Sequence, residues 1–175
     1  MIIAVEGIDK VGKDTLIKGL QKNLGGYILT SRRPLSFSTN EADQVSDRYD
    51  CLYDNAAANN PIISIINRCH MSEMVYSGVM RKRSRIDDPA MADLTKKFGR
   101  YSGILVYLFN TDSTELARRF AREREEYVVK EHIRLLFPRY DVCLEKFELD
   151  GVNVIKIDTT NKTAEEVLKE VMDKI

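Results

Sequence analysis

The short stretch EGIDKVGKDT, residues 6–15, carries residue types that suit phosphate binding. Gly7 and Gly12 enclose four residues and Lys13 follows directly, with an apolar run before the stretch and a helical pattern after it. Glycine allows backbone conformations that turn successive N–H groups inward, and a helix N-terminus adds partial positive charge. Lys13 can then reach the terminal phosphates of a nucleotide. The spacing therefore predicts a phosphate-binding loop at 7–13, with Asp14 and Thr15 in the following turn.

Asp14 is unusual in this loop, because a Ser or Thr hydroxyl normally follows the lysine and binds Mg²⁺. A carboxylate is also a hard oxygen ligand that suits Mg²⁺, although its charge repels phosphate unless a metal lies between them. The alternative is an acidic residue that the helix dipole favours in the first turn. Thr15 keeps a hydroxyl close by.

Composition narrows the possible partners and compartment. The 27 basic and 27 acidic side chains of the 175-residue chain cancel, so no global field attracts nucleic acid or an anionic membrane. The basic run at 81–85 is better explained as a solvated helix end than as a nucleic-acid contact. Three cysteines without a CxxC pair indicate free thiols, and neither a signal peptide nor a membrane-spanning run is evident. We expect a cytoplasmic protein without a membrane partner.

Short apolar runs alternate with helical patterns along the chain. The expected strands are 2–6, 27–30, 62–66, 104–109 and 152–157, and the expected helices are 14–24, 68–83, 88–98, a helix capped by Asp112 and a last helix with Thr163 and Glu166 as a capping box. Such alternation predicts a parallel, three-layer α/β sheet whose ligands bind at the carboxyl ends of the strands. We find no linker or repeat, so we expect one domain.

The segment EGxDxxGK resembles the phosphate loop of thymidylate kinases, and the similarity continues along most of the chain. Further blocks resemble that family in the same order: RRP at 32–34, SDRY at 46–49, NRCHMSEMVYSG at 67–78, LARRFARERE at 116–125 and IDTTNKTAEEV at 157–167. The resemblance implies a P-loop kinase fold, with a five-stranded parallel sheet flanked by helices. It also implies a single domain over 1–175 with a short arginine-rich lid around 118–127.

The same resemblance implies roles for individual residues. Arg32 and Arg68 would hold the monophosphate of the acceptor, and Arg48 would reach its base. Ser72 would lie near the base, and Tyr76 would pack under the sugar and disfavour a ribose 2′-hydroxyl. These positions together imply an acceptor that is a deoxynucleotide.

Other implied contacts lie on the donor side. Asp9 would meet the sugar or acceptor, and Lys10 stands where some relatives carry an arginine that approaches the transferring group. In the lid, Arg118 and Arg122 lie four residues apart, and like charges at that spacing repel unless an anion lies between them. We expect both to contact phosphate, whereas Arg119 is expected to pair with Glu123.

The chain departs from the family pattern at four positions. Asn67 replaces an aspartate that lies near the metal and its water, so one acid is lost at 67 and one is gained at 14. We hypothesise that Asp14 supplies the metal-side charge that Asn67 no longer does. Gln44 replaces a phenylalanine that stacks on thymine, and Glu73 stands beside Ser72. Gln44 and Glu73 either contact a modified base or are surface substitutions.

These features predict an enzyme that transfers a phosphoryl group from ATP, with Mg²⁺, to a deoxynucleoside monophosphate whose base is a standard or a modified pyrimidine. The alternatives are a kinase of a deoxynucleoside or modified-base hydroxyl, which benefits from a general base, and a non-catalytic nucleotide-binding protein. A homodimer through helix 68–80 is a further option, for which Met71, Met74, Val75 and Val79 are available. The same four residues would also suit the core.

Overall fold

The structure is a computed structural model, and it describes residues 1–29, 42–80, 84–122 and 130–175. Its strands are β1 (Ile2–Glu6), β2 (Tyr27–Leu29), β3 (Ser64–Asn67), β4 (Gly103–Phe109) and β5 (Asn153–Asp158). Its helices are α1 (Lys13–Leu24), α2 (Ala42–Ala58), α3 (Met71–Met80), α4 (Asp88–Arg100), α5 (Ser113–Arg122), α6 (Lys130–Leu149) and α7 (Ala164–Met172).

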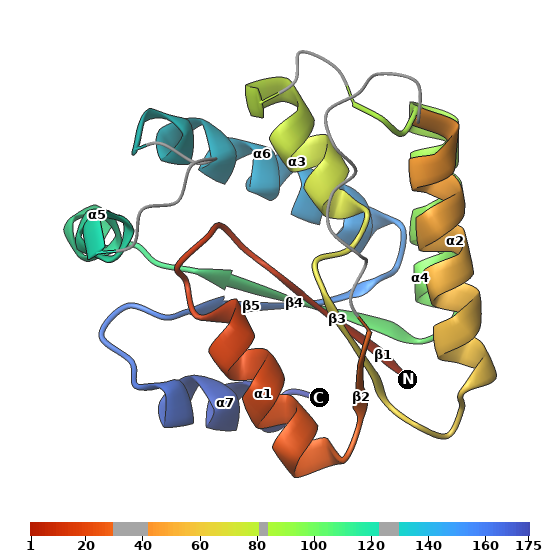
Figure 1. The fold of residues 1–175 in the computed structure, drawn as a ribbon, viewed down its shortest axis with the longest axis horizontal. Helices are drawn as coiled ribbons and strands as arrows, with labels where there is room; N and C mark the ends of the chain where they lie inside the picture. Colours follow the sequence, from red (N-terminus) through yellow and green to blue (C-terminus); the bar gives the residue numbers. More distant parts are fainter. Residues whose placement is uncertain (30–41, 81–83, 123–129) are drawn as a thin grey trace.

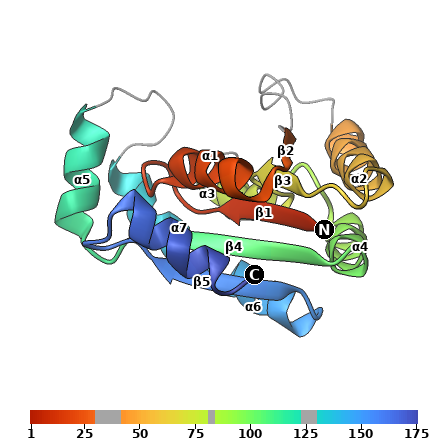
Figure 2. The same cartoon turned by 90° about the horizontal axis from the view of Figure 1, so that it is seen from below.

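The strands in the described residues form one parallel sheet in the order β2-β3-β1-β4-β5. Helix α1 packs beside α7 on one face, and α3 packs beside α6 on the other (Figure 1). Helices α2 and α4 contact each other at one end of the molecule, and α5 stands at the opposite end (Figure 2). The predicted three-layer α/β fold with five parallel strands is confirmed.

The central strands have apolar residues on both faces because helices cover both sides of the sheet. All five residues of β1 are buried, as are the first six of β4. Met71 and Val75 of α3 are fully buried in this core, so they serve packing within one chain, while Met74 and Val79 are partly buried. Cys69 and Cys143 are buried free thiols, whereas Cys51 is an exposed one.

Predicted boundaries shift by one to three residues at most ends. The strand predicted at 62–66 runs from Ser64 to Asn67, which makes Asn67 the last residue of β3. Thr163 and Glu166 form the predicted capping box, and Asp112 accepts hydrogen bonds from the backbone N–H groups of Thr114 and Glu115. Both caps supply partners for helix N–H groups that have none within the helix.

Helices α2 and α6 were missing from the predicted elements, although the SDRY block at 46–49 lies within α2. The buried residues of α6 recur every three or four positions, at Ile133, Leu136, Tyr140, Cys143 and Phe147. That period is a helical signal. Pro138 interrupts it in the sequence but lies on the exposed side of the helix. None of the helices in the described ranges is long and apolar enough to cross a membrane.

Candidate active site

The loop between β1 and α1 has the backbone of a phosphate-binding loop. Gly7 has a φ of 140°, and a Cβ atom there would lie 2.3 Å from the carbonyl oxygen of Leu108 on the neighbouring strand. Gly12, directly before α1, has a φ of 100°. Both conformations favour glycine, and at Gly7 the close approach of β4 requires it as well. Lys10 also has a positive φ, of 66°.

Lys13 folds back onto this loop. Its Nζ donates a 2.7 Å hydrogen bond to the carbonyl oxygen of Ile8 and lies 3.6 Å from the carboxylate of Asp9. Only 7% of the residue is exposed. Burial, followed by the nearby charge of Arg68, lowers the pKa of Lys13 to about 7. The loop therefore holds an amine whose charged form is disfavoured by burial.

Arg68 follows β3 and reaches across to the phosphate loop. Its Nη1 donates to the carbonyl oxygen of Gly7 at 3.0 Å and to the hydroxyl of Tyr140 at 3.2 Å, and its Nη2 bonds to Asp9. The guanidinium carbon lies 4.9 Å from the centre of the Tyr76 ring. Arg68 has a φ of 67°, which is uncommon for a side-chain-bearing residue. This backbone conformation and these contacts fix a cation directly beside the loop.

Glu6 lies beneath Arg68 and was not singled out from the sequence. Its carboxylate is fully buried and accepts from the backbone N–H of Cys69 at 2.8 Å, from the Ser72 hydroxyl at 2.9 Å and from the Tyr140 hydroxyl at 3.1 Å. The Arg68 guanidinium is 3.8 Å away. A buried carboxylate is costly unless such partners compensate it. Glu6 therefore ties β1, the start of α3 and α6 together around Arg68.

Asp14 and Asn67, the two departures near the expected metal, are in direct contact. Asn67 Nδ2 donates to Asp14 Oδ1 at 2.9 Å. Asn67 Oδ1 is buried without a hydrogen-bond partner in the described part of the chain. Carboxylate and amide oxygens are ligand types that Mg²⁺ accepts, so the chemistry of the pair suits a magnesium ion. No group of three His, Cys, Asp or Glu suited to a metal occurs in the described residues.

The fold has close counterparts among solved structures, although no protein-family model and no curated protein matches the sequence. A structure of YorR protein from Bacillus subtilis, in complex with phosphorylated GDP, has a TM-score of 0.77 at 21% identity and covers 99% of this chain and 94% of its own. A deoxyadenosine kinase from M. mycoides, with products dCMP and dCDP bound, has a TM-score of 0.60 at 15% identity, with 99% and 98% covered.

A gluconokinase from Sinorhizobium meliloti has a TM-score of 0.59 at 12% identity and covers 98% of this chain and 89% of its own. The fold is that of the P-loop kinases. At these identities the likeness concerns the fold, so the resemblance to thymidylate kinases in particular stays a prediction.

Two predicted acceptor-side residues lie beside Arg68. The ring of Tyr76 packs under the guanidinium and edge-on to Tyr140, at 6.4 Å between ring centres. Its hydroxyl is buried without a hydrogen-bond partner among the described residues, and burial raises the pKa of Tyr76 to about 12. Ser72 is buried, and its hydroxyl binds Glu6. Tyr76 and Ser72 therefore lie directly beside Arg68, and their roles toward an acceptor stay predictions.

For the other predicted acceptor residues, no contact with Arg68 is observed in the described part of the chain. Glu73 is 6% exposed, and Arg85 holds its carboxylate through two hydrogen bonds of 2.6 and 3.0 Å. It is therefore not a surface substitution. Arg48 is exposed on α2. Arg32 and the side chain of Gln44 lie outside the described residues, so their roles stay predictions.

The lid arginines differ from expectation in one respect. Arg118 is exposed on α5, and the side chain of Arg122 lies outside the described part, as do residues 123–127 of the predicted lid. Arg119 binds Glu115 at 3.0 Å, and its expected partner Glu123 lies outside the described residues, so that pair stays a prediction. Its Nη1 also donates to the carbonyl oxygen of Lys10 at 3.2 Å. Arg119 thus contacts the phosphate loop, which the sequence did not indicate.

His70 and Cys69, next to Arg68, have structural environments. Tyr53 and Thr95 bind the two ring nitrogens of His70 at 2.5 and 2.9 Å, and the Thr95 hydroxyl donates onward to the Met91 carbonyl. Burial lowers the pKa of His70 to about 3, so the ring is neutral. Because the Thr95 hydroxyl donates to Met91, Nε2 of His70 carries the proton. This series of hydrogen bonds holds in place the segment that leads from Arg68 into α3.

Proposed function

We propose that the protein is an ATP-dependent kinase that transfers the γ-phosphoryl group of ATP to a pyrimidine deoxynucleoside monophosphate, as thymidylate kinases do. The observation that carries the proposal is the 3.0 Å contact between Arg68 Nη1 and the Gly7 carbonyl. Arginine binds phosphate through two parallel hydrogen bonds, so a cation at this place would hold an acceptor phosphate next to the donor's terminal phosphate. The YorR and deoxyadenosine kinase structures, which hold nucleotides, support the same ligand class.

Substrate binding would exchange protein contacts for phosphate contacts. Lys13 would leave the Ile8 carbonyl for the β- and γ-phosphates, and Arg68 would leave Asp9 for the acceptor phosphate. Phosphoryl transfer needs mainly positioning and charge stabilisation, and a monophosphate acceptor is already nucleophilic. Lys13 and Arg68 supply the positive charge. In this proposal Lys10, Arg118 and Arg122 add charge as the lid closes, and Arg32 and Arg48 complete acceptor binding.

Asp14 and Asn67 would hold the magnesium ion together with the phosphates of ATP. The ion supplies positive charge on the transferring group. The hydrogen bond from Asn67 orients the Asp14 carboxylate, while the first turn of α1 fixes its position. Tyr76, beneath Arg68, would pack under the deoxyribose and disfavour a 2′-hydroxyl.

A second candidate, a kinase that phosphorylates a hydroxyl, is favoured by the position of Asp9. Its carboxylate forms ion pairs with both Lys13 and Arg68, two cations of the phosphate loop region. A hydroxyl acceptor bound there would need a general base. The monophosphate remains the preferred acceptor because the same two cations, Lys13 and Arg68, lie together where they could hold its phosphate group.

The proposal is tested by incubating the protein with Mg-ATP and separate deoxynucleoside monophosphates, hydroxymethylated pyrimidines included, and by following diphosphate formation. Transfer to one monophosphate, abolished by Lys13→Met, is the expected result. Deoxynucleosides and ribonucleotides are run in parallel. Transfer to a nucleoside alone would favour the second candidate, and ATP binding without any transfer would contradict both.

A further inference from the structure

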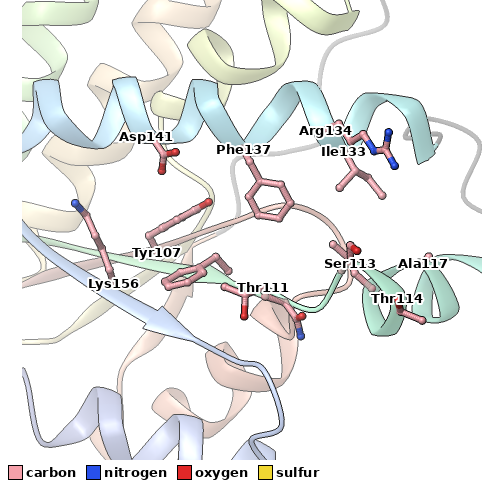
Figure 3. Close-up of a pocket in the computed structure, with 13 residues that line it drawn as sticks. Tyr107, Thr111, Ser113, Thr114, Ala117, Ile133, Arg134, Phe137, Asp141 and Lys156 are labelled. Atoms are coloured by element: carbon pink, nitrogen blue, oxygen red, sulfur yellow. The ribbon is translucent and has the colours of Figure 1, made fainter.

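A large cavity lies outside the phosphate loop, between α5, α6 and the carboxyl ends of β4 and β5 (Figure 3). Its volume is about 700 Å³, within the range of small-molecule sites. Its apolar wall consists of Tyr107, Phe109, Leu116, Ala117, Ile133 and Phe137. Of the described residues that line it, none belongs to the loop 7–13 and none is Arg68. The cavity is therefore a separate space, not an extension of the phosphate site.

The apolar wall suits a flat ring. Tyr107 and Phe109 project from the same face of β4 with ring centres 5.7 Å apart and planes inclined by only 18°. Together they form a floor of two nearly parallel aromatic faces. Phe137 points from α6 toward this floor (Figure 3). Aromatic side chains that converge in this way favour an aromatic ligand through offset-stacked or edge-on contacts.

The charged lining residues lie at two ends of the cavity (Figure 3). At one end, Lys156 pairs with Glu148 at 2.8 Å and Asp141 is its neighbour, so positive charge there is compensated. At the other end, Arg134 is exposed and makes no ion pair with any residue that the structure describes. The two ends therefore differ in sign: Asp141 and Glu148 outweigh Lys156 at one end, and the positive charge of Arg134 lies at the α5–α6 end.

Asn110 gives the wall a hydrogen-bond donor. The residue is 2% exposed, its Oδ1 accepts from the backbone N–H of Asp112, and its Nδ2 has no partner among the described residues. A buried donor without an acceptor is destabilising.

We propose that this cavity binds a planar aromatic molecule that carries one negative charge, at a site distinct from the nucleotide site. The ring lies between Phe137 and the Tyr107–Phe109 floor, and the anionic group lies at Arg134. The site is independent of whether the phosphate loop transfers phosphate.

The test uses 8-anilinonaphthalene-1-sulfonate, a fluorescent aromatic anion, as the probe. We expect saturable binding with one probe per chain that Mg-ATP does not displace. Ala117→Trp fills the cavity and should weaken binding by about tenfold or more, because the ring loses its space. The matched control is Ala164→Trp, at an exposed alanine that does not line the cavity, and it should bind as the wild type does.

Arg134→Gln tests the charge without filling the space, at an exposed position where misfolding is not expected. It should weaken binding of the sulfonate by about two- to fivefold, as for an exposed charge pair, and leave binding of neutral N-phenyl-1-naphthylamine unchanged. The thermal midpoint and ATP affinity of each variant verify its fold. Displacement of the probe by Mg-ATP, binding unaffected by both substitutions, or several probes per chain would each overturn the proposal.

Discussion

The side-chain amide of Asn67 donates a 2.9 Å hydrogen bond to the carboxylate of Asp14 and joins the end of β3 to the first turn of α1. The two residues are 53 positions apart in the sequence, and each departs from the pattern of the family that the chain resembles. The contact uses Oδ1 of Asp14, and no other hydrogen bond to this carboxylate comes from a described residue. The remaining oxygen is therefore available to a cation.

Exchanging these two side chains should reveal whether they act as a unit. Asp14→Ser removes the charge and should lower Mg²⁺ affinity in the ATP complex by about tenfold, together with the rate of transfer. Asp14→Ser combined with Asn67→Asp returns one carboxylate to the pair and should restore both. Electron paramagnetic resonance of Mn²⁺, with and without ATP, measures metal binding independently of turnover.

A control for the exchange is Asn67→Asp alone, which places two carboxylates in contact and should shift the midpoint of thermal unfolding downward. A double variant that binds Mn²⁺ no better than Asp14→Ser would show that the two positions are not linked.

Nucleotide binding should take up a proton at Lys13. The pKa of this lysine is lowered to about 7 in the free protein, and phosphate beside the amine restores its charge. Above pH 7 a net uptake of up to one proton per ATP is expected from this residue, and affinity should rise as pH falls from 9 toward 7. Titration calorimetry in buffers of different ionisation enthalpy measures the uptake, and Lys13→Met should abolish it.

The same lysine should affect stability with a definite sign. Between pH 7 and 10.5 the unfolded chain binds a proton at Lys13 that the folded chain does not, so this residue makes stability rise with pH there. Lys13→Met should therefore stabilise the ligand-free protein at pH 7, because a desolvated amine is removed. The difference in urea midpoint between the two proteins should shrink toward pH 10. A difference independent of pH would contradict the assignment.

Local patterns were sufficient for the sheet and the phosphate loop. Continuous apolar runs, such as the one at 104–109, marked buried parallel strands, and the spacing of Gly7, Gly12 and Lys13 marked the loop. Both signals lie within a few residues, because a strand and a βα turn are each determined locally.

Contacts between distant segments were not predictable in this way. Tyr140 binds Glu6 across 134 positions, and Arg119 binds the Lys10 carbonyl across 109. The hydrophobic periodicity of a segment does not indicate which distant helix packs over the end of a given strand. Tyr140 could not be predicted for two reasons: its partner Glu6 is distant in the sequence, and α6, which carries it, was missing from the predicted elements. Glu6 was visible in the loop pattern, but its role depends on its partners from α3 and α6.

The two loop glycines should differ sharply when replaced by alanine. At Gly7 a Cβ atom would lie 2.3 Å from the Leu108 carbonyl oxygen, and because that oxygen belongs to the backbone of β4, the clash needs a shift of a central strand. Gly7→Ala should lose about 3 kcal/mol or more of unfolding free energy, and with it ATP binding.

Gly12→Ala is the matched control, because a Cβ atom there meets nothing within 4 Å and only the φ of 100° opposes it. A loss of about 1–2 kcal/mol is expected. Urea unfolding measures both variants, and equal losses would mean that the approach of β4 to the loop does not restrict Gly7.

Replacing Arg68 by lysine should separate acceptor binding from ATP binding. Lysine keeps the charge but lacks the planar fork that bonds at once to the Gly7 carbonyl, Tyr140 and Asp9. Arg68→Lys should raise the KM for the acceptor by about 100-fold, since two charge-assisted bonds to phosphate are weakened, and change the KM for ATP by less than about threefold. Arg100→Lys, at an exposed position on α4, should change neither constant. If the KM for ATP rose as much as that for the acceptor, Arg68 would act on the loop as a whole and not on the acceptor phosphate.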